Sequence, residues 1–295
     1  MSGHEDLDSQ QSGRLYVVAT PIGNLEDLSP RALAMLKQAG RIYAEDTRTS
    51  AVLLSHYGIG TPVKALHEHN EGRAAAEVID YLRSGHDVAL ICDAGTPAIS
   101  DPGALLVEQA HAAGVQVNAV PGPNAAVAAM SVAGLQGAFC FAGFLPPKSA
   151  ARCKVLEGWR DFEHALVLYE APHRILECVE DIAAVMGVER ELVIARELTK
   201  RFEQVKRLKA GEASAWLRAD DNRQRGEFVL VIAGATTTED RVAAEGERIL
   251  HILLSELPLK QAAKLAAQIS GARKNALYEL GLKMDRNKPT ESEDE

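Results

Sequence analysis

Cysteine is scarce in this chain, which has only four in 295 residues: Cys92, Cys140, Cys153 and Cys178. They are too few and too irregularly spaced for a disulfide framework, and the sequence has no C-x-x-C pair that could hold zinc. We therefore expect four reduced, buried thiols and no metal site. Small disulfide-stapled and zinc-ribbon domains are excluded.

Long apolar runs are also missing. No stretch approaches the roughly 18 residues that span a bilayer. The N-terminal stretch MSGHEDLDSQQSG is polar and acidic, without the basic start and apolar centre of a secretory signal. These absences predict a soluble, cytoplasmic protein that is not anchored to a membrane.

Positive charge is in deficit, because 32 Lys and Arg stand against 41 Asp and Glu, for a net charge of −9. This balance argues against a protein that coats nucleic acid in general. Two segments, 200–209 and 257–288, are nevertheless basic. Charge runs are usually only solvated faces, yet this asymmetry favours contacts with RNA phosphates. The predicted RNA-binding residues are Lys200, Arg201, Lys206, Arg207, Lys260, Lys264, Arg273 and Lys274.

Short apolar runs alternate with amphipathic stretches in the N-terminal part of the chain. Such alternation is typical of βαβ units in a parallel sheet. One helical stretch begins with Ser29 as the expected N-cap and Pro30 at the first helical position. The expected strands are 15–19, 41–45, 87–92 and 115–120.

A second series of strands follows at closer spacing, and ARELTKRFEQVKRL has the pattern of a hairpin, which predicts a mixed sheet. Beyond it the pattern is helical only, with a helix, short turn, helix arrangement after Pro258. The fold class is therefore α/β, with two α/β domains and a small C-terminal helical segment. The expected division is an N-terminal tail (1–13), an α/β domain (14–136), a mixed α/β domain (137–236), a basic helical segment (237–288) and an acidic tail (289–295).

Three expected strands of the first domain end in loops rich in Gly and Pro: ATPIGNLEDLSP, DAGTPAISDPG and PGPNAA. Any one loop has the plain interpretation of a turn, but three at equivalent strand ends favour a ligand pocket built mainly from main chain. Neither G-x-G-x-x-G nor the P-loop pattern occurs. We expect a nucleoside-bearing ligand without a pyrophosphate, with Asp93 at the strand tip beside it.

A set of motifs along residues 14–282 resembles the tetrapyrrole methylase superfamily. The motifs are TPIGNLEDLSPRAL, AEDTR, LHEHNE, DAGTPAISDPG, PGPNAA, GFLPPK, YEAPHR, ARELTK, GEFVLV and LPLKQAAKLAA followed by KNALY. The resemblance implies a homodimer that binds S-adenosylmethionine in a cleft between two α/β domains. It is strongest to members that act on ribosomal RNA, which implies 2′-O-methylation of a cytidine in the decoding centre of 16S rRNA, within the 30S subunit.

The resemblance also implies the cofactor-binding residues. The three loops and YEAPHR supply Pro21, Ile22, Gly23, Asn24, Asp93, Ala94, Gly95, Thr96, Ser100, Pro121, Gly122, Tyr169, Ala171 and Pro172. No metal is expected to take part in the transfer.

A ribose hydroxyl is weakly acidic, so a base or a cation should assist its deprotonation. The polar motifs AEDTR, LHEHNE and ELTK provide the catalytic candidates, which are Glu45, Asp46, Arg48, His69 and Lys200. His67 and Glu71 belong to the same motifs, and the two histidines share a side only if KALHEH is a strand. Asp46 has an equally good interpretation as the cap of a helix that begins near Thr49. Arg174 of YEAPHR has the alternative interpretation of an ion pair at the domain interface.

Two rival functions remain open on the sequence alone. One is a methylase of the same fold that acts on a small tetrapyrrole-like substrate, against which the basic C-terminal segment argues. The other is a non-enzymatic nucleic-acid-binding protein that uses the C-terminal helices and carries the α/β part as a scaffold.

Overall fold

The computed structural model describes residues 12–235 and 239–286. The chain divides into two compact units, one ending at Ala233 and the other beginning at Gly234. The acidic tail expected at 289–295 and almost all of the N-terminal tail lie outside the described residues. Within the described ranges, no helix combines the length and apolar character needed to cross a membrane.

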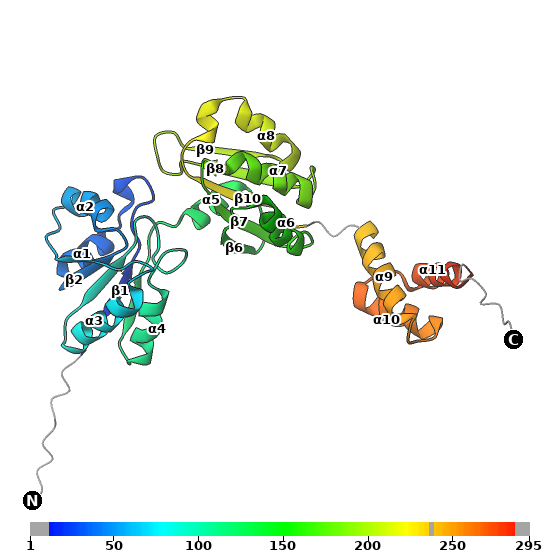
Figure 1. Cartoon of the computed structure of the whole chain (residues 1–295), viewed down its shortest axis with the longest axis horizontal. Helices are drawn as coiled ribbons and strands as arrows, with labels where there is room; N and C mark the ends of the chain where they lie inside the picture. Colours follow the sequence, from blue (N-terminus) through cyan, green and yellow to red (C-terminus); the bar gives the residue numbers. More distant parts are fainter. Residues whose placement is uncertain (1–11, 236–238, 287–295) are drawn as a thin grey trace, which may run out of the picture. The chain divides into compact units, whose positions relative to one another are not determined.

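The first sheet of the larger unit, here called the parallel sheet, confirms the predicted βαβ organisation (Figure 1). Its strands follow the order β3-β2-β4-β1-β5, and every neighbouring pair is parallel. The strands are β1 (Leu15–Val18), β2 (Arg41–Ala44), β3 (Val63–Ala65), β4 (Val88–Ile91) and β5 (Val117–Val120). Strand β3 ends before His67, so KALHEH is not a strand over its length.

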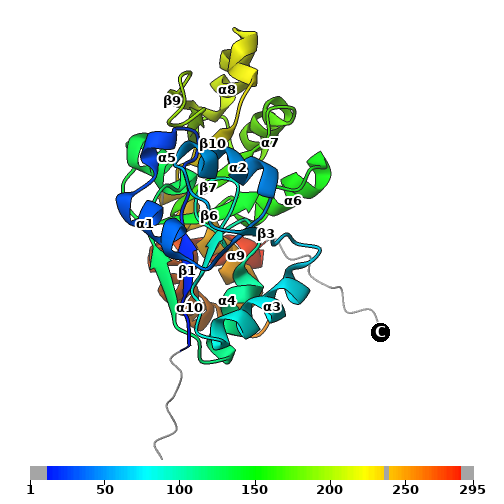
Figure 2. The ribbon, with the colours of Figure 1, turned by 90° about the vertical axis from the view of Figure 1, so that its left-hand side faces the viewer.

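Helices cover both faces of the parallel sheet. Successive residues of a strand point to opposite faces, so neighbouring residues contact different helices. Leu90 packs with α3 and α4 on one face, and Ile91 packs with α1 and α2 on the other. Figure 2 shows α3 and α4 side by side. The helices are α1 (Pro30–Gln38), α2 (Thr47–His56), α3 (Glu71–Arg83) and α4 (Ala104–Ala112), with the short helix η1 (Leu25–Asp27) before α1. Ser29 caps α1 as predicted, since its Oγ accepts a hydrogen bond from the Ala32 N–H at 3.0 Å.

The second sheet, here called the mixed sheet, has the order β6-β7-β10-β8-β9. Strands β6 and β7 are parallel and the other pairs are antiparallel, and β8 and β9 form the predicted hairpin. The strands are β6 (Phe139–Phe144), β7 (Ala165–Glu170), β8 (Glu191–Arg196), β9 (Gln204–Lys209) and β10 (Phe228–Ile232). One face packs against α6 (Ser149–Gly158), α7 (Ile175–Met186) and α8 (Ala210–Arg218), and η2 (Asp221–Gln224) follows α8.

Helix α5 (Ala125–Ala133) joins the two sheets, because it follows β5 in the chain but packs on the mixed sheet. Its small residues Ala126, Ala129 and Ala133 lie against Val167 and Val193. The last strand end of the parallel sheet therefore connects directly to the core of the mixed sheet.

The cysteines are all free, but they are not all buried as expected. Cys92 and Cys178 are buried, Cys153 is half-buried and Cys140 is exposed. Cys140 lies on β6, an edge strand, where part of the strand has no neighbour to cover it.

The smaller unit is helical, as the sequence predicts. Its helices are α9 (Glu239–Leu253), α10 (Leu259–Ser270) and α11 (Lys274–Arg286). Pro258 precedes the first turn of α10, and Gly271 ends this helix in the left-handed conformation with φ of 76°. Leu250, Ala263, Ala266 and Leu277 form its core.

Candidate active site

The three Gly- and Pro-rich loops after β1, β4 and β5 converge, as predicted. Thr20 and Gly95 exchange backbone hydrogen bonds of 2.8 and 3.0 Å, which join the first loop to the second. The Thr96 hydroxyl donates a hydrogen bond to the carbonyl oxygen of Pro123 at 3.1 Å, which joins the second loop to the third. The loops therefore form one connected edge at the carboxyl ends of the parallel strands.

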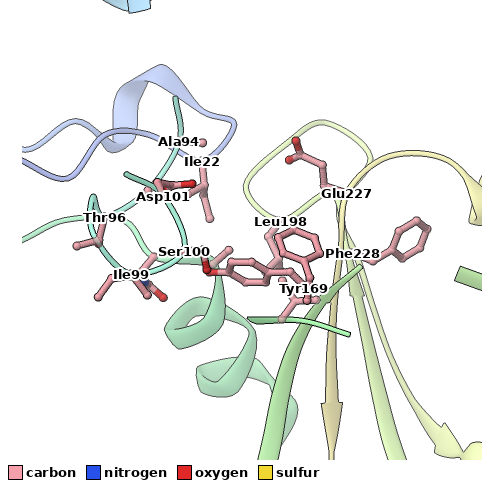
Figure 3. Close-up of a pocket in the computed structure, with 15 residues that line it drawn as sticks. Ile22, Ala94, Thr96, Ile99, Ser100, Asp101, Tyr169, Leu198, Glu227 and Phe228 are labelled. Atoms are coloured by element: carbon pink, nitrogen blue, oxygen red, sulfur yellow. The ribbon is translucent and has the colours of Figure 1, made fainter. Parts of the chain in front are cut away.

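A cavity of about 240 Å³ opens between this edge and the mixed sheet. That volume is many times the roughly 30 Å³ that a water molecule occupies in the liquid, so the cavity is large enough for a small-molecule ligand. Figure 3 shows the ring of Tyr169 reaching across from the mixed sheet toward Ser100. The loops contribute Ile22, Ala94, Gly95, Thr96, Ile99, Ser100, Asp101, Asn124 and Ala125. The mixed sheet and its loops contribute Phe144, Tyr169, Leu198, Glu227, Phe228 and Val229.

The structure places fewer than half of the predicted cofactor-binding residues on the cavity wall. Those that line it are Ile22, Ala94, Gly95, Thr96, Ser100 and Tyr169. Pro21, Gly23, Asn24, Asp93, Pro121, Gly122, Ala171 and Pro172 are not among the lining residues. Asn24 has a local role instead, since its Oδ1 accepts a hydrogen bond from the Glu26 N–H and caps η1.

Asp101, which the sequence analysis did not select, is the carboxylate on the wall of the cavity beside the three loops. Burial raises the pKa of Asp101, and the negative charge of Asp93 raises it further, while the nearby Cys92 thiol lowers it. Burial also raises the pKa of Glu45, with the charges of Asp101 and Asp93 adding to the effect. Three acidic side chains from neighbouring strand ends are therefore close enough to interact, and one of them faces the cavity.

Glu71 determines the position of the segment that carries Asp101. Helix α4 begins after Gly103, which has no side chain to cap it. The Glu71 carboxylate, at the start of α3, accepts hydrogen bonds from the N–H groups of Gly103 at 2.9 Å and Leu105 at 3.0 Å. Gly103 has φ of 130°, and an added Cβ would lie 2.7 Å from Leu90 Cδ2, so this position requires glycine. Glu71 thus holds the loop that carries Asp101 and is not itself a lining residue of the cavity.

Lys200 lies in an ion-pair network at the cavity rim. Its ammonium donates hydrogen bonds to Glu197 at 2.9 Å and to Glu227 at 2.8 Å, and Glu227 lines the cavity. Burial alone would lower the pKa of Lys200, but the two carboxylates outweigh it and leave the pKa raised. An added Cβ on Gly23 would lie 2.4 Å from the Lys200 side chain. The first loop therefore touches the ELTK turn directly.

The other predicted catalytic residues lie away from the cavity wall. Asp46 is the N-cap of α2, which begins at Thr47, and it forms a 2.7 Å ion pair with Arg48. Hydrogen bonds from Arg48 lower the pKa of Asp46 to about 2, so this carboxylate is a weak base. The interpretation of Asp46 as a helix cap is therefore confirmed. His69 is exposed and is not a lining residue.

Arg174 makes its contacts within the part of the chain that carries the mixed sheet. Its guanidinium donates to the carbonyl oxygen of Leu145 at 2.6 Å and pairs with the buried carboxylate of Glu170 at 3.1 Å. The alternative of an ion pair between the two α/β parts is wrong, because these contacts tie the end of β7 to the loop after β6.

The basic hairpin is less free than its sequence suggests. Arg207 forms an ion pair with Glu191 at 2.8 Å and donates to the Gly134 carbonyl oxygen. Lys200 is held by its two carboxylates, and Arg201 and Lys206 are exposed. In the described part of the chain, no group of three His, Cys, Asp or Glu side chains is arranged to hold a metal ion.

Comparison with protein families identifies the chain. Residues 14–214 match the family model of the Tetrapyrrole (Corrin/Porphyrin) Methylases, and residues 240–285 match that of the RsmI C-terminal HTH domain. The chain belongs to the tetrapyrrole methylase family. Its cofactor is accordingly S-adenosylmethionine, as in the other tetrapyrrole methylases.

Curated relatives of this tetrapyrrole methylase match it almost end to end. It is 52% identical over 274 residues to the ribosomal RNA small subunit methyltransferase I of Pseudomonas aeruginosa, covering 92% of this chain and 97% of that one. It is 46% identical over 283 residues to the protein of the same name from Escherichia coli O157:H7, covering 96% and 99%.

Solved structures show the same fold at low identity. Diphthine synthase superposes with a TM-score of 0.60 at 17% identity, covering 77% of this chain and 92% of that one. A uroporphyrin-III C-methyltransferase from Thermus thermophilus, complexed with S-adenosylhomocysteine, gives a TM-score of 0.53 at 17% identity, covering 75% and 97%. At such identities the likeness establishes the fold only.

Sequence reasoning missed lining residues for two reasons. Asp101 and Ile99 belong to the DAGTPAISDPG motif, which was selected, and the second Asp-Pro-Gly at its end was a usable signal. The remaining missed residues also lie within selected motifs, namely PGPNAA, GFLPPK, ARELTK and GEFVLV. They enter the cavity only through packing of the two sheets or at the start of α5, so the motifs gave no means of choosing them over their neighbours. They are Asn124, Ala125, Phe144, Leu198, Glu227, Phe228 and Val229.

We expect Glu71→Ala to destabilise the protein by about 0.5 to 2 kcal/mol, the range found when a helix N-cap is removed. Glu71→Gln, which retains an acceptor oxygen, should lose less. Chemical denaturation monitored by circular dichroism measures the change. The exposed neighbour Glu68 provides the control, and Glu68→Ala should change stability by less than about 0.5 kcal/mol. Equal stability of the two alanine variants would contradict the capping role.

Proposed function

We propose that this tetrapyrrole methylase transfers a methyl group from S-adenosylmethionine to the ribose 2′-oxygen of a cytidine in the decoding centre of 16S rRNA. The observation that carries the proposal is the near-complete match to proteins named ribosomal RNA small subunit methyltransferase I. That match includes both the cavity-bearing unit and the helical unit. The cytidine and the 2′-oxygen come from the resemblance of the motifs.

The cavity wall suits an adenosyl cofactor. Ile22, Ile99 and Leu198 provide apolar surface for a flat base, while Thr96 and Ser100 provide hydroxyl groups for hydrogen bonds. When bound, the cofactor supplies an electrophilic methyl group on a positively charged sulfur. The negative charge of Asp101 is electrostatically favourable beside that sulfur.

Asp101 is also the best base for the ribose hydroxyl. Of the other ionisable residues on the wall, Glu227 is paired with Lys200, and burial raises the pKa of Tyr169 so that it stays protonated at neutral pH. A carboxylate with a raised pKa accepts a proton more readily than an ordinary one. In the proposed step the hydroxyl proton passes to Asp101 as the oxygen–carbon bond forms and the carbon–sulfur bond breaks.

The rest of the wall has a positioning role. In-line transfer to an already activated carbon needs alignment of the reacting atoms and exclusion of water. Phe144, Tyr169 and Leu198 cover the cavity from the mixed-sheet side, and the Lys200 network fixes Glu227 at its rim. Lys200 thus has a structural role at the rim of the cavity.

The helical unit is the proposed RNA anchor. Lys260 and Lys264 are exposed and lie four residues apart on α10, on one face of the helix. Arg273 and Lys274 are exposed at the turn into α11. Such a group of cations supplies sequence-independent phosphate contacts. On the hairpin, Arg201 and Lys206 remain candidates for the same task.

The proposed substrate also determines the proposed partner and the location in the cell. We propose the 30S subunit as the partner, and therefore the cytoplasm as the location. The homodimer is also part of the proposal, supported by exposed apolar side chains on α5 and the edge strand β6, namely Val127, Val132 and Phe139. A small tetrapyrrole-like substrate is less favoured, because the solved structure of a uroporphyrin-III C-methyltransferase shares only the fold with this chain.

The substrate assignment predicts that radiolabelled methyl groups enter 16S rRNA when unmethylated small ribosomal subunits are the acceptor. The label should remain in a dinucleotide after alkaline hydrolysis, because a 2′-O-methyl group blocks cleavage of the adjacent phosphodiester. A tetrapyrrole acceptor should take up no label. Label in the tetrapyrrole, or in a base of the RNA, would overturn the proposal.

We expect Asp101→Asn to reduce methyl transfer by about 10² to 10⁴-fold, the usual contribution of a positioned base. Affinity for S-adenosylhomocysteine, which lacks the positive charge on sulfur, should change only a few-fold in calorimetry. Asp93→Asn is the comparison variant, because Asp93 lies outside the cavity wall and acts on Asp101 through its charge; its loss should reduce transfer far less than the loss of Asp101. Full activity of Asp101→Asn would exclude Asp101 as the base.

The same variant should be at least as stable as the wild type at neutral pH. The folded-state pKa of Asp101 is raised above its ordinary 3.8, so ionisation opposes folding as the pH rises through the folded pKa. Asparagine removes that penalty. Thermal unfolding at pH 7 measures the difference, which should vanish well below pH 3.8.

The double substitution Lys260→Gln/Lys264→Gln should weaken binding to small subunits and make the salt dependence shallower. Each phosphate contact contributes about 0.7 to 0.9 to the slope of log affinity against log salt, so the slope should fall by about 1 to 2. Lys148→Gln/Lys154→Gln, at two exposed lysines of the α6 region, is the matched control. An unchanged slope in the first variant would remove α10 from the RNA interface.

A further inference from the structure

The turn between β8 and β9 exposes a large aromatic side chain close to the cavity. Phe202 is 65% exposed, and Arg201 places its guanidinium carbon 5.7 Å from the centre of the Phe202 ring. The same turn contains Leu198, which lines the cavity, and Lys200, which is bound to the lining residue Glu227. An aromatic ring and a cation therefore project beside the rim of the proposed active site.

The backbone of this turn is held in an unusual conformation. Glu197 has φ of 53° and Thr199 has φ of 65°, values that side-chain-bearing residues rarely adopt. Such backbone strain persists where surrounding contacts impose it, and it occurs most often at ligand sites. The Thr199 N–H donates a hydrogen bond of 2.6 Å to the Glu203 carboxylate, which closes the turn.

A buried cation fixes the outer part of the turn. Arg196 is only 6% exposed, and its guanidinium donates to the carbonyl oxygen of Phe202 at 3.2 Å and to the Gln204 side chain at 3.0 Å. A third hydrogen bond of 2.7 Å reaches the carbonyl oxygen of Arg225, in the loop before β10. Phe202 is therefore exposed on a rigid support, and little conformational freedom would be lost on binding.

We propose that Phe202, with Arg201, is a stacking platform for a base of the RNA next to the nucleotide that is methylated. This inference rests on the proposed function. A ribose hydroxyl enters this cavity when its nucleotide leaves the helical stack, and the neighbouring base then loses a stacking partner. Proteins commonly replace that partner with an aromatic ring or an arginine guanidinium.

Three substitutions at Phe202 test the platform with unmethylated small subunits as substrate. Phe202→Ala should lower kcat/KM roughly tenfold or more, mainly through KM, because one stacked base is lost. Phe202→Leu retains apolar area without an aromatic face and should be impaired similarly, while Phe202→Trp should be as active as the wild type. Affinity for S-adenosylmethionine and the unfolding temperature should be unchanged in all three. Wild-type activity in Phe202→Leu would overturn the proposal.

A binding measurement separates this inference from the proposed reaction. In Phe202→Trp, an added 16S rRNA transcript should quench fluorescence beyond the quenching seen for the wild type, whose two tryptophans are the background. Additional quenching supports the platform even if the methylated atom is not the 2′-oxygen, and its absence overturns the platform. A change of oligomeric mass in Phe202→Ala by light scattering would also overturn it, because Phe202 would then belong to an interface between copies.

Discussion

The partial burial of one carboxylate, Asp101, at the ends of the parallel strands is the constraint on which the proposed active site depends. A buried acidic group is unfavourable unless its surroundings hold it in place. Here the Glu71 carboxylate binds the start of α4 two residues later, and the Thr20 and Thr96 contacts join the loop to its two neighbours. The acid is thus presented to the cavity by hydrogen bonds of the Glu71 and Thr96 side chains to backbone groups, and by the backbone bonds between Thr20 and Gly95. Its raised pKa, and with it the proposed basicity, follows from that placement.

The sequence predicted the two sheets and the convergence of the loops better than it predicted which side chains line the cavity. Apolar periodicity and the repeated Gly and Pro loops were sufficient for the two sheets and for the convergence of the loops, because both depend on local patterns. Asp93 was selected because it directly follows an apolar run, but the strand tip is exposed and the loop returns to bring Asp101 inward. Leu198 and Glu227 belong to the selected motifs ARELTK and GEFVLV. They join the cavity through packing between sheets, which the local sequence could not use to single them out within each motif.

Counting charges overstated the basic character of the hairpin. Arg207 and Lys209 are paired with Glu191 and Glu189, which lie across the strand pair or just before β8. Residues that are distant in the chain become neighbours in an antiparallel ladder, so opposite charges can neutralise one another without any trace in the sequence. The α10 lysines differ, since they share one exposed helix face. The exposed lysines of α10 are therefore a better guide to phosphate contacts than the charge count of the hairpin.

Helix α5 has a consequence for how this architecture can vary. Its first turn borders the cavity through Asn124 and Ala125, its Ala126 N–H donates to the Tyr169 hydroxyl at 3.3 Å, and its alanines complete the core of the mixed sheet. A substitution that enlarges one of those alanines would push on both the binding wall and the neighbouring sheet. The two α/β parts are consequently not interchangeable modules. We expect the two parts to evolve together, with the side chains of α5 kept small where this helix contacts the cavity and the mixed sheet.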